Sequence, residues 1–223
     1  MYSEKSDKEL LELLEDHALL TFESQLCLKE ELAKRNLNEN ISDLDQAISD
    51  KLAGIKNLEY LKDYGLSANR DENGLVITRT TKAMLTDILA VILGLIVFFI
   101  GIYGIVNLVM TFVNGEELDV FTLAFKFAVA ALVFIGLSFL GGLKRLFDYS
   151  GFELSNRGDG ITLRKRFDVK LEDLKASQDD LYLDYEDDSL QLKLSDEVIL
   201  TSTTENLVQK MTLEELTKQL KNG

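Results

Sequence analysis

The sequence predicts a membrane protein in which a two-helix transmembrane hairpin separates two regions of different secondary structure. The region before the hairpin is α-helical with a small β-hairpin, and the region after it is a mainly antiparallel β domain with a terminal helix. One observation is the segregation of charge: between positions 88 and 143 only Glu116, Glu117, Asp119 and Lys126 are charged. Another is the alternation of apolar and polar residues after position 150, which is typical of half-buried strands. We expect boundaries at residues 1–82, 83–146 and 147–223.

The charge of the flanking regions excludes one class of function. The net charge is −14, and residues 1–87 hold 11 basic and 18 acidic residues, while residues 144–223 hold 12 and 17. Neither region has the basic surplus that binding to a phosphate backbone requires, so we expect no nucleic-acid partner. The only cysteine, Cys27, has no partner for an internal disulfide, which indicates a reducing compartment.

Three helices are expected in the first 65 residues. Ser6 and Glu9 have the spacing of a capping box ahead of a leucine-rich stretch. A second helix is expected over Thr21–Arg35, and a third begins at Ser42 and runs to a stop at Gly65. Two short extended stretches follow, Leu66–Arg70 and Leu75–Thr80, and the Asn73-Gly74 pair between them favours a tight hairpin turn.

The second helix also carries a family resemblance. Thr21–Leu37 resembles a small helical module that is common in bacterial proteins and often precedes membrane segments. Its pattern is Leu-x-x-Glu-Ala followed by Leu-x-x-Glu-Leu-x-x-Arg-x-Leu, and this chain has Ser24 where the family favours alanine. The resemblance implies a bacterial protein and attaches no chemistry to the module.

Two apolar segments are long enough to cross a bilayer. Residues 88–113 contain no charge, and at about 1.5 Å per residue they reach roughly 39 Å, against a hydrocarbon core of about 30 Å. Residues 120–143 contain one charged residue, Lys126, which is near enough to the start of the segment for its ammonium to reach the headgroups. Two buried helices of a soluble protein would not be apolar on all sides over this length.

The orientation follows from the charges beside the two segments. The short connection Asn114–Asp119 is acidic, whereas Arg79, Lys82, Lys144 and Arg145 flank the opposite ends. By the positive-inside rule both termini are cytoplasmic, and we expect a multi-pass protein of the bacterial inner membrane.

Small residues in the two segments mark candidate helix-packing positions. Gly94, Gly101 and Gly104 lie on one side of the first segment, and Ala124 and Ala128 belong to a similar stripe in the second. Small residues allow helix backbones to approach closely in lipid. Packing within the hairpin and packing against another copy or a partner both remain open.

The region after the hairpin is expected to form a meander of strands. Apolar residues alternate at 152–154, 161–163, 181–185, 190–194 and 198–200, with turn signals such as Asn156–Gly160 between them. Thr212–Glu215 has the pattern of a capping box and predicts the start of a terminal helix.

This order resembles bacterial membrane proteins in which a two-span hairpin leads into a pleckstrin-homology-like β domain. The residues that carry the resemblance are Gly160–Phe167, Leu171–Leu174 and the paired stretches within Leu181–Leu194. Such domains are mostly binding platforms, and the resemblance brings no ligand motif with it.

A basic cluster is the one candidate for lipid contact. Near an anionic leaflet each basic residue gains about 1 kcal/mol from attraction to the headgroups. The residues are Lys144, Arg145, Arg164, Lys165 and Arg166. The alternative interpretation is that these residues only set the orientation of the hairpin in the membrane and solvate the edge of a strand.

The sequence predicts no enzyme and no cofactor. It contains no phosphate-binding glycine loop, nucleophile elbow or dinucleotide motif, and the single His17 and single Cys27 do not make a metal site. We therefore expect a membrane-anchored scaffold or accessory subunit that contacts lipids and either binds a protein partner or self-associates. A small homo-oligomeric channel built from the hairpin is the alternative.

Overall fold

The computed structural model describes residues 1–37, 41–72, 74–115, 119–157, 160–167 and 170–222. The chain divides into two compact units. Unit 1 consists of Met1–Ile77, Ser155–Thr162 and Lys175–Gly223, and unit 2 of Thr78–Leu154 and Leu163–Leu174. Three sequence predictions concern residues outside the described ones: the Asn73 turn position, the loop acids Glu116 and Glu117, and part of the turn at 156–160.

Unit 1 begins with the three predicted α-helices and with two 3₁₀ helices that were not predicted. They are α1 (Asp7–Glu15), η1 (His17–Leu19), α2 (Phe22–Lys34), α3 (Ser42–Lys56) and η2 (Glu59–Tyr64). The capping box is confirmed, since the Ser6 backbone N–H donates to Glu9 Oε2 at 2.7 Å and the Ser6 hydroxyl accepts from the Glu9 N–H. The prediction that the third helix continues to Gly65 is wrong. Leu58 adopts φ +58°, which ends the α-helical path after Asn57, and Gly65 instead caps the 3₁₀ helix η2.

The leucine-rich faces of these helices form a common core with the end of the chain. Its buried members are Tyr2, Leu10, Leu14, Phe22, Leu28, Leu32, Leu44, Ile48 and Ile55. Leu207, Val208 and Met211 of α6 (Leu207–Lys221) pack against this core. Residues from both sides of the apolar segments therefore fold together within unit 1.

The strands form two sheets. The first has the order β1 (Leu66–Asp71), β2 (Gly74–Arg79), β3 (Glu153–Ser155), β4 (Ile161–Phe167) and β5 (Lys170–Ala176). Sequence reasoning did not assign β5 as a strand. Its residues are exposed at four successive positions, so it lacks the alternation that reveals a half-buried strand.

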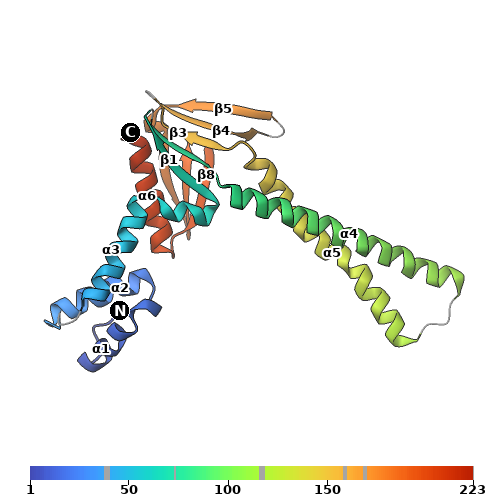
Figure 1. Cartoon of the computed structure of the whole chain (residues 1–223), viewed down its shortest axis with the longest axis horizontal. Coiled ribbons are helices and arrows are strands. Elements are labelled where there is room, and N and C mark those ends of the chain that lie inside the picture. The colour runs from blue at the N-terminus through green and yellow to red at the C-terminus, as the bar shows by residue number, and fades with distance from the viewer. Residues whose placement is uncertain (38–40, 73, 116–118, 158–159, 168–169, 223) are drawn as a thin grey trace. The chain divides into compact units, whose positions relative to one another are not determined.

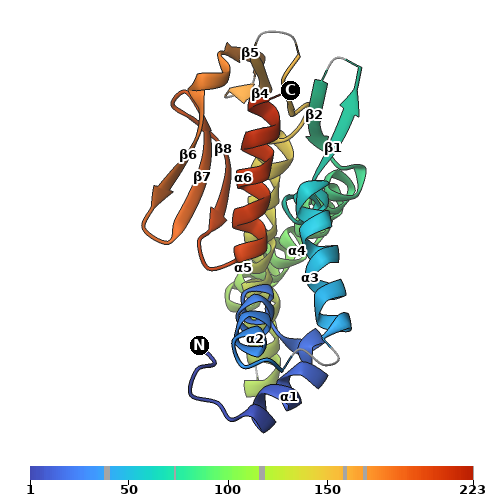
Figure 2. The same cartoon turned by 90° about the vertical axis from the view of Figure 1, so that its left-hand side faces the viewer.

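The second sheet lies wholly in unit 1. It is an antiparallel meander of β6 (Leu181–Glu186), β7 (Ser189–Leu194) and β8 (Glu197–Thr203), preceded by the short η3 (Gln178–Asp180). Leu181 pairs with Leu194, and Leu192 pairs with Leu200, so the apolar residues share one face. Figure 2 shows α6 lying along this sheet, where it buries Leu213, Leu216 and Leu220.

The terminal helix is confirmed, but its predicted start is wrong. α6 begins at Leu207, with the Asn206 side chain accepting a hydrogen bond from the Gln209 N–H at 3.2 Å. Thr212 lies inside the helix, fully buried, and its hydroxyl donates to the Val208 carbonyl at 2.7 Å. A Thr-x-x-Glu pattern at an interior position matches a capping box by spacing alone.

Unit 2 contains the two long apolar helices, α4 (Thr81–Asn114) and α5 (Val120–Asp148). Figure 1 shows them side by side as a hairpin. Each is long and apolar enough to cross a membrane, and most of its apolar side chains are exposed in the structure. At about 1.5 Å per residue, the 34 residues of α4 span roughly 51 Å, so its first turns extend beyond the length that a bilayer core requires.

Candidate functional site

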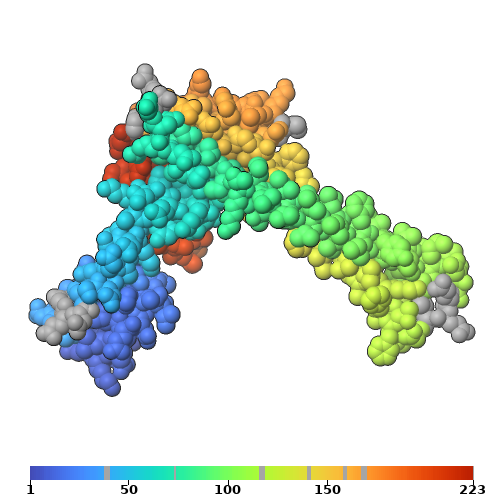
Figure 3. Space-filling view, viewed as in Figure 1, coloured from blue at the N-terminus to red at the C-terminus, as the bar shows by residue number. Residues whose placement is uncertain are grey.

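The α4–α5 hairpin is the most distinctive feature of the chain, and glycines determine how closely its helices pack. A side chain at Gly101 would collide with the backbone of Val133 and meet its Cγ2 at 2.7 Å. At Gly104 a Cβ would lie 2.7 Å from the Ala130 nitrogen, and at Gly94 it would lie 2.7 Å from Phe139 Cβ. The three glycines are buried, and Figure 3 shows the outer surface of the two helices. These positions let the two backbones approach closely.

The alanine stripe of α5 lies elsewhere. Ala124 and Ala128 are exposed, and the α5 residues nearest the α4 glycines are Ala130, Val133 and Phe139. Gly136 in turn faces Phe98, whose backbone nitrogen would be 2.5 Å from an added Cβ. Of the two interpretations left open by the sequence, packing within the hairpin therefore describes Gly94, Gly101 and Gly104, but not the two alanines.

A polar network lies near the loop end of the hairpin. The Lys126 ammonium donates to Thr111 Oγ1, and the Thr111 hydroxyl donates to the Asn107 carbonyl at 3.0 Å. Thr111 is buried, so its hydroxyl provides a local acceptor for the lysine in otherwise apolar surroundings. The sequence led us to expect that Lys126 reaches the headgroups, and it did not show that Thr111 accepts its hydrogen bond.

The opposite end of the hairpin is fixed by an arginine. Arg79, at the end of β2, pairs with Asp87 on α4, and their side chains are 8% and 13% exposed. The Arg79 guanidinium also lies 4.6 Å from the ring centroid of Tyr149, which caps the end of α5. One cation thus joins β2, α4 and the end of α5, whereas in the sequence Arg79 could be interpreted only as a topogenic charge.

The five basic residues predicted for lipid contact all belong to unit 2. Lys144 and Arg145 are exposed near the end of α5. Arg164 on β4 makes a two-point ion pair with Asp173 on β5, at 2.7 and 3.0 Å, and remains 45% exposed. This pairing raises the pKa of Arg164 above its ordinary value. Lys165 and Arg166 are half-buried on the same strand.

In unit 1 a buried asparagine joins segments from both sides of the hairpin. Asn156 is 1% exposed, and its Oδ1 accepts from the Leu75 N–H at 2.6 Å. Its Nδ2 donates to the carbonyls of Gln219 and Leu220 at 3.3 and 3.1 Å. In the sequence Asn156 looked like the first residue of a turn. The structure makes it the polar link between β2 and the end of α6.

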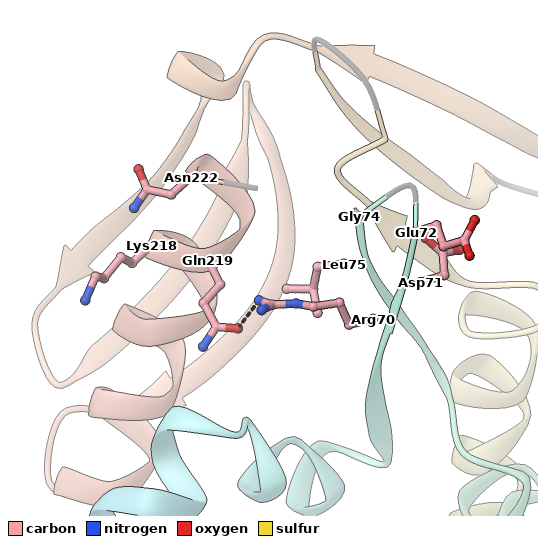
Figure 4. Close-up of a pocket in the computed structure, with 8 residues that line it drawn as sticks. All are labelled: Arg70, Asp71, Glu72, Gly74, Leu75, Lys218, Gln219 and Asn222. Carbon is pink, nitrogen blue, oxygen red and sulfur yellow. Dashed lines mark hydrogen bonds between the residues drawn. The ribbon is translucent and has the colours of Figure 1, made fainter.

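An open groove of about 500 Å³ lies beside this link (Figure 4). Its lining comes from the β1–β2 hairpin and the last turn of α6, and consists of Arg70, Asp71, Glu72, Gly74, Leu75, Lys218, Gln219 and Asn222. Arg70 Nη2 donates to Gln219 Oε1 at 3.1 Å, and Gln219 Nε2 donates to the Lys56 carbonyl at 2.7 Å. Charges of both signs line the groove, so it has no single electrostatic preference.

The arginine of the N-terminal motif, Arg35, has a structural role. Arg35 pairs with Glu31 at 2.8 Å and donates to the carbonyls of Ser3 and Lys5 and to Asp7. Hydrogen bonds to Asp7 and Glu31 raise the pKa of Arg35 above its ordinary value. The arginine of the motif therefore holds the first residues of the chain against α2.

The remaining candidates from the sequence have ordinary structural surroundings. His17 Nδ1 lies 3.0 Å from the Leu14 carbonyl oxygen, and Cys27 packs against the N-terminal core. Among the described residues, no group of three or more His, Cys, Asp or Glu side chains is placed to hold a metal ion. Comparison with family models, curated proteins and solved structures finds no significant match to this chain.

Proposed function

We propose that the chain is a membrane-anchored interaction protein of the bacterial inner membrane, in which the α4–α5 hairpin is the anchor and unit 1 is the binding body. The observation that carries this proposal is the composition of unit 1. Residues before α4 and residues after α5 share one core and one hydrogen-bonded link at Asn156. A chain built in this way holds one folded body at one side of its anchor.

The exposed side chains of the hairpin support insertion into a bilayer. Large apolar residues such as Phe99, Phe121 and Phe134 are exposed on α4 and α5. Exposure of apolar surface to water costs about 25 cal/mol per Å², so an apolar surface that extends along two long helices requires an apolar environment. Charged residues are confined to the ends of the hairpin, as insertion requires.

The position of both flanks in one unit supports a cytoplasmic location for both termini. The two segments of unit 1 have to be on the same side of the bilayer in order to share a core. The basic residues Lys82, Lys144 and Arg145 favour the cytoplasmic side, and the loop at the other end contains Asp119.

Charge distribution supports binding to a partner by unit 1. Unit 1 contains 15 basic and 29 acidic residues, whereas unit 2 contains nine of each, so the whole net charge of −14 belongs to unit 1. An anionic leaflet repels such a body, which leaves its surface available to proteins in solution. The same charge favours a partner with a basic surface.

Sidedness is tested by cysteine labelling. The Cys27→Ser variant has no cysteine, so Asn114→Cys and Asn222→Cys in that background each supply a single exposed thiol. In intact spheroplasts an impermeant maleimide should label position 114 and should label position 222 only after permeabilisation. Labelling of both positions in intact spheroplasts would contradict the proposed topology.

Partner binding is tested by native mass determination of the complex, gently solubilised from its own membranes. A foreign chain at a fixed ratio, lost when unit 1 is destabilised by Asn156→Ala, supports the scaffold. A monomer that carries no partner at cellular concentration would refute it.

The exposed face of α5 gives the channel alternative one specific support. Ala124 and Ala128 lie outside the hairpin interface and would allow close contact between copies. A closed homo-oligomer of four or more copies, with ion flux in liposomes that is lost in Asn107→Leu, would favour the channel. Absence of flux from such an oligomer would count against it.

A further inference from the structure

The end of α5 and the β4–β5 pair bring basic and apolar side chains together within unit 2. Figure 1 shows β4 and β5 beside the last turns of α5. A specific contact fixes this arrangement: a Cβ at Gly151, in the turn that follows α5, would lie 3.2 Å from the Cδ atoms of Leu171 on β5. Gly151 adopts φ +81°, which lets the chain turn at this point. Leu171 therefore lies over the exit from α5.

The side chains exposed in this region include large apolar residues and cations, together with the acidic Asp148 and Glu172. Phe147 on α5 and Leu171 on β5 are 52% and 46% exposed, although both are large and apolar. Lys144 and Arg145 lie within one turn of Phe147, and Lys170 precedes Leu171; all three are exposed. Exposed apolar residues among cations, next to an apolar helix, have the composition of a surface that binds at the headgroup level of a bilayer.

Charge distinguishes this surface from the rest of the molecule. Unit 2 is neutral overall, with nine basic and nine acidic residues, while unit 1 carries the net charge of −14. An anionic leaflet would therefore repel unit 1 and attract the basic residues at the end of α5. A basic protein partner would prefer unit 1, so charge assigns the two surfaces to different occupants.

We infer that the start of β5, together with the last turns of α5, docks on anionic phospholipid headgroups, with Leu171 and Phe147 entering the headgroup region. This inference rests on the proposed insertion of the hairpin. It adds a second membrane contact beyond the bilayer-spanning part of the helices, through residues that are not needed to span the bilayer.

The chain contains no tryptophan, so a single introduced tryptophan reports its own position. Three variants are compared in the full chain, reconstituted into bilayers of brominated phosphatidylcholine with or without phosphatidylglycerol. Leu171→Trp tests the docking surface. Phe125→Trp, at a position 70% exposed on α5, reports insertion of the hairpin, and Tyr182→Trp on β6 of unit 1 is the control that should remain in water.

The expected result is strong quenching at position 125 in both bilayers and no quenching at position 182. At position 171 quenching should appear in the anionic bilayer. The fraction of molecules whose position 171 contacts the bilayer should fall about fivefold for each engaged cation that is lost. It should also fall when the salt is raised from about 0.1 to 1 M, because salt screens the attraction. A bimane-labelled Leu171→Cys in the Cys27→Ser background repeats the measurement if tryptophan disturbs the contact with Gly151.

The alternatives give separate results. Quenching at position 125 but not at position 171, in either form of the probe, overturns the docking inference and leaves insertion intact. Equal quenching at position 171 in neutral and anionic bilayers, insensitive to salt, overturns the assignment to anionic headgroups. No quenching at position 125 overturns hairpin insertion and, with it, both proposals.

Discussion

Replacement of Asn156 by alanine should destabilise unit 1 by several kcal/mol. The substitution removes the acceptor of the buried Leu75 N–H, which costs about 1–3 kcal/mol when no other acceptor is available. It also removes the donor to the Gln219 and Leu220 carbonyls, each worth about 0.5–1.5 kcal/mol. The sum is about 2–6 kcal/mol, a large fraction of the roughly 5–15 kcal/mol that stabilises a typical domain.

Thermal unfolding in mild detergent measures this loss through a thiol-reactive dye. Cys27 is the only thiol and is partly buried against the N-terminal core, so its labelling reports the opening of unit 1. At about 2–4 °C per kcal/mol, the midpoint should fall by roughly 10 °C. Asn222→Ala removes the same amide from an exposed position near the end of α6 and should leave the midpoint unchanged.

A second substitution tests the direction of the hydrogen bonds. Asn156→Asp keeps an acceptor for Leu75 but places a carboxylate beside two carbonyls at the negative end of α6. It should destabilise unit 1 near neutral pH and recover partly when the carboxylate is protonated. If the stability of Asn156→Ala lies within about 0.5 kcal/mol of that of the parent, the proposed role of the buried amide is refuted, because substitutions at exposed positions have effects of that size.

The remaining predictions concern the hairpin, its base and the N-terminal module. Gly101→Leu should cost about 1–3 kcal/mol by forcing α4 from α5, measured by thermal unfolding in detergent, whereas Ala128→Leu should be neutral in the monomer. Asp87→Asn removes the counter-charge of a buried arginine and should cost about 3–5 kcal/mol in the same assay; a neutral result would show that its ion pair is dispensable. Arg35→Gln should release the first residues of the chain and speed their proteolysis, with the rest of unit 1 as internal reference. Backbone and side-chain hydrogen bonds from Ser6 lower the pKa of Glu9 below its ordinary value of 4.5, so its carboxylate stabilises α1 above that pH. This contribution should be lost as the pH falls through the lowered pKa, and Glu9→Gln should remove that part of the acid dependence of α1 hydrogen exchange.

The sequence by itself determined the features that depend on local composition and spacing. α4 and α5 could be predicted because each contains a long stretch that is apolar on all sides. In a bilayer such a stretch can satisfy its backbone hydrogen-bonding groups only as a helix. The start of α1 could be predicted because Ser6 and Glu9 bond to each other across three residues. The strand β7 could be predicted because Leu190, Leu192 and Leu194 are buried on one face while the residues between them are not.

Features that depend on contacts between distant residues were decided by the tertiary structure alone. Asn156 and Leu75 are separated by 81 residues, and no local spacing distinguishes a buried asparagine from a turn asparagine. For the same reason β5 was not predicted, since most of its side chains are exposed. The sequence also did not show that Thr212 is buried in the interior of α6. The sequence could mark Gly101 and Ala128 equally as small residues. Only the approach of the two backbones shows that Gly101 faces Val133 while Ala128 remains exposed, because the helix face used for packing depends on the partner surface as well as on residue size.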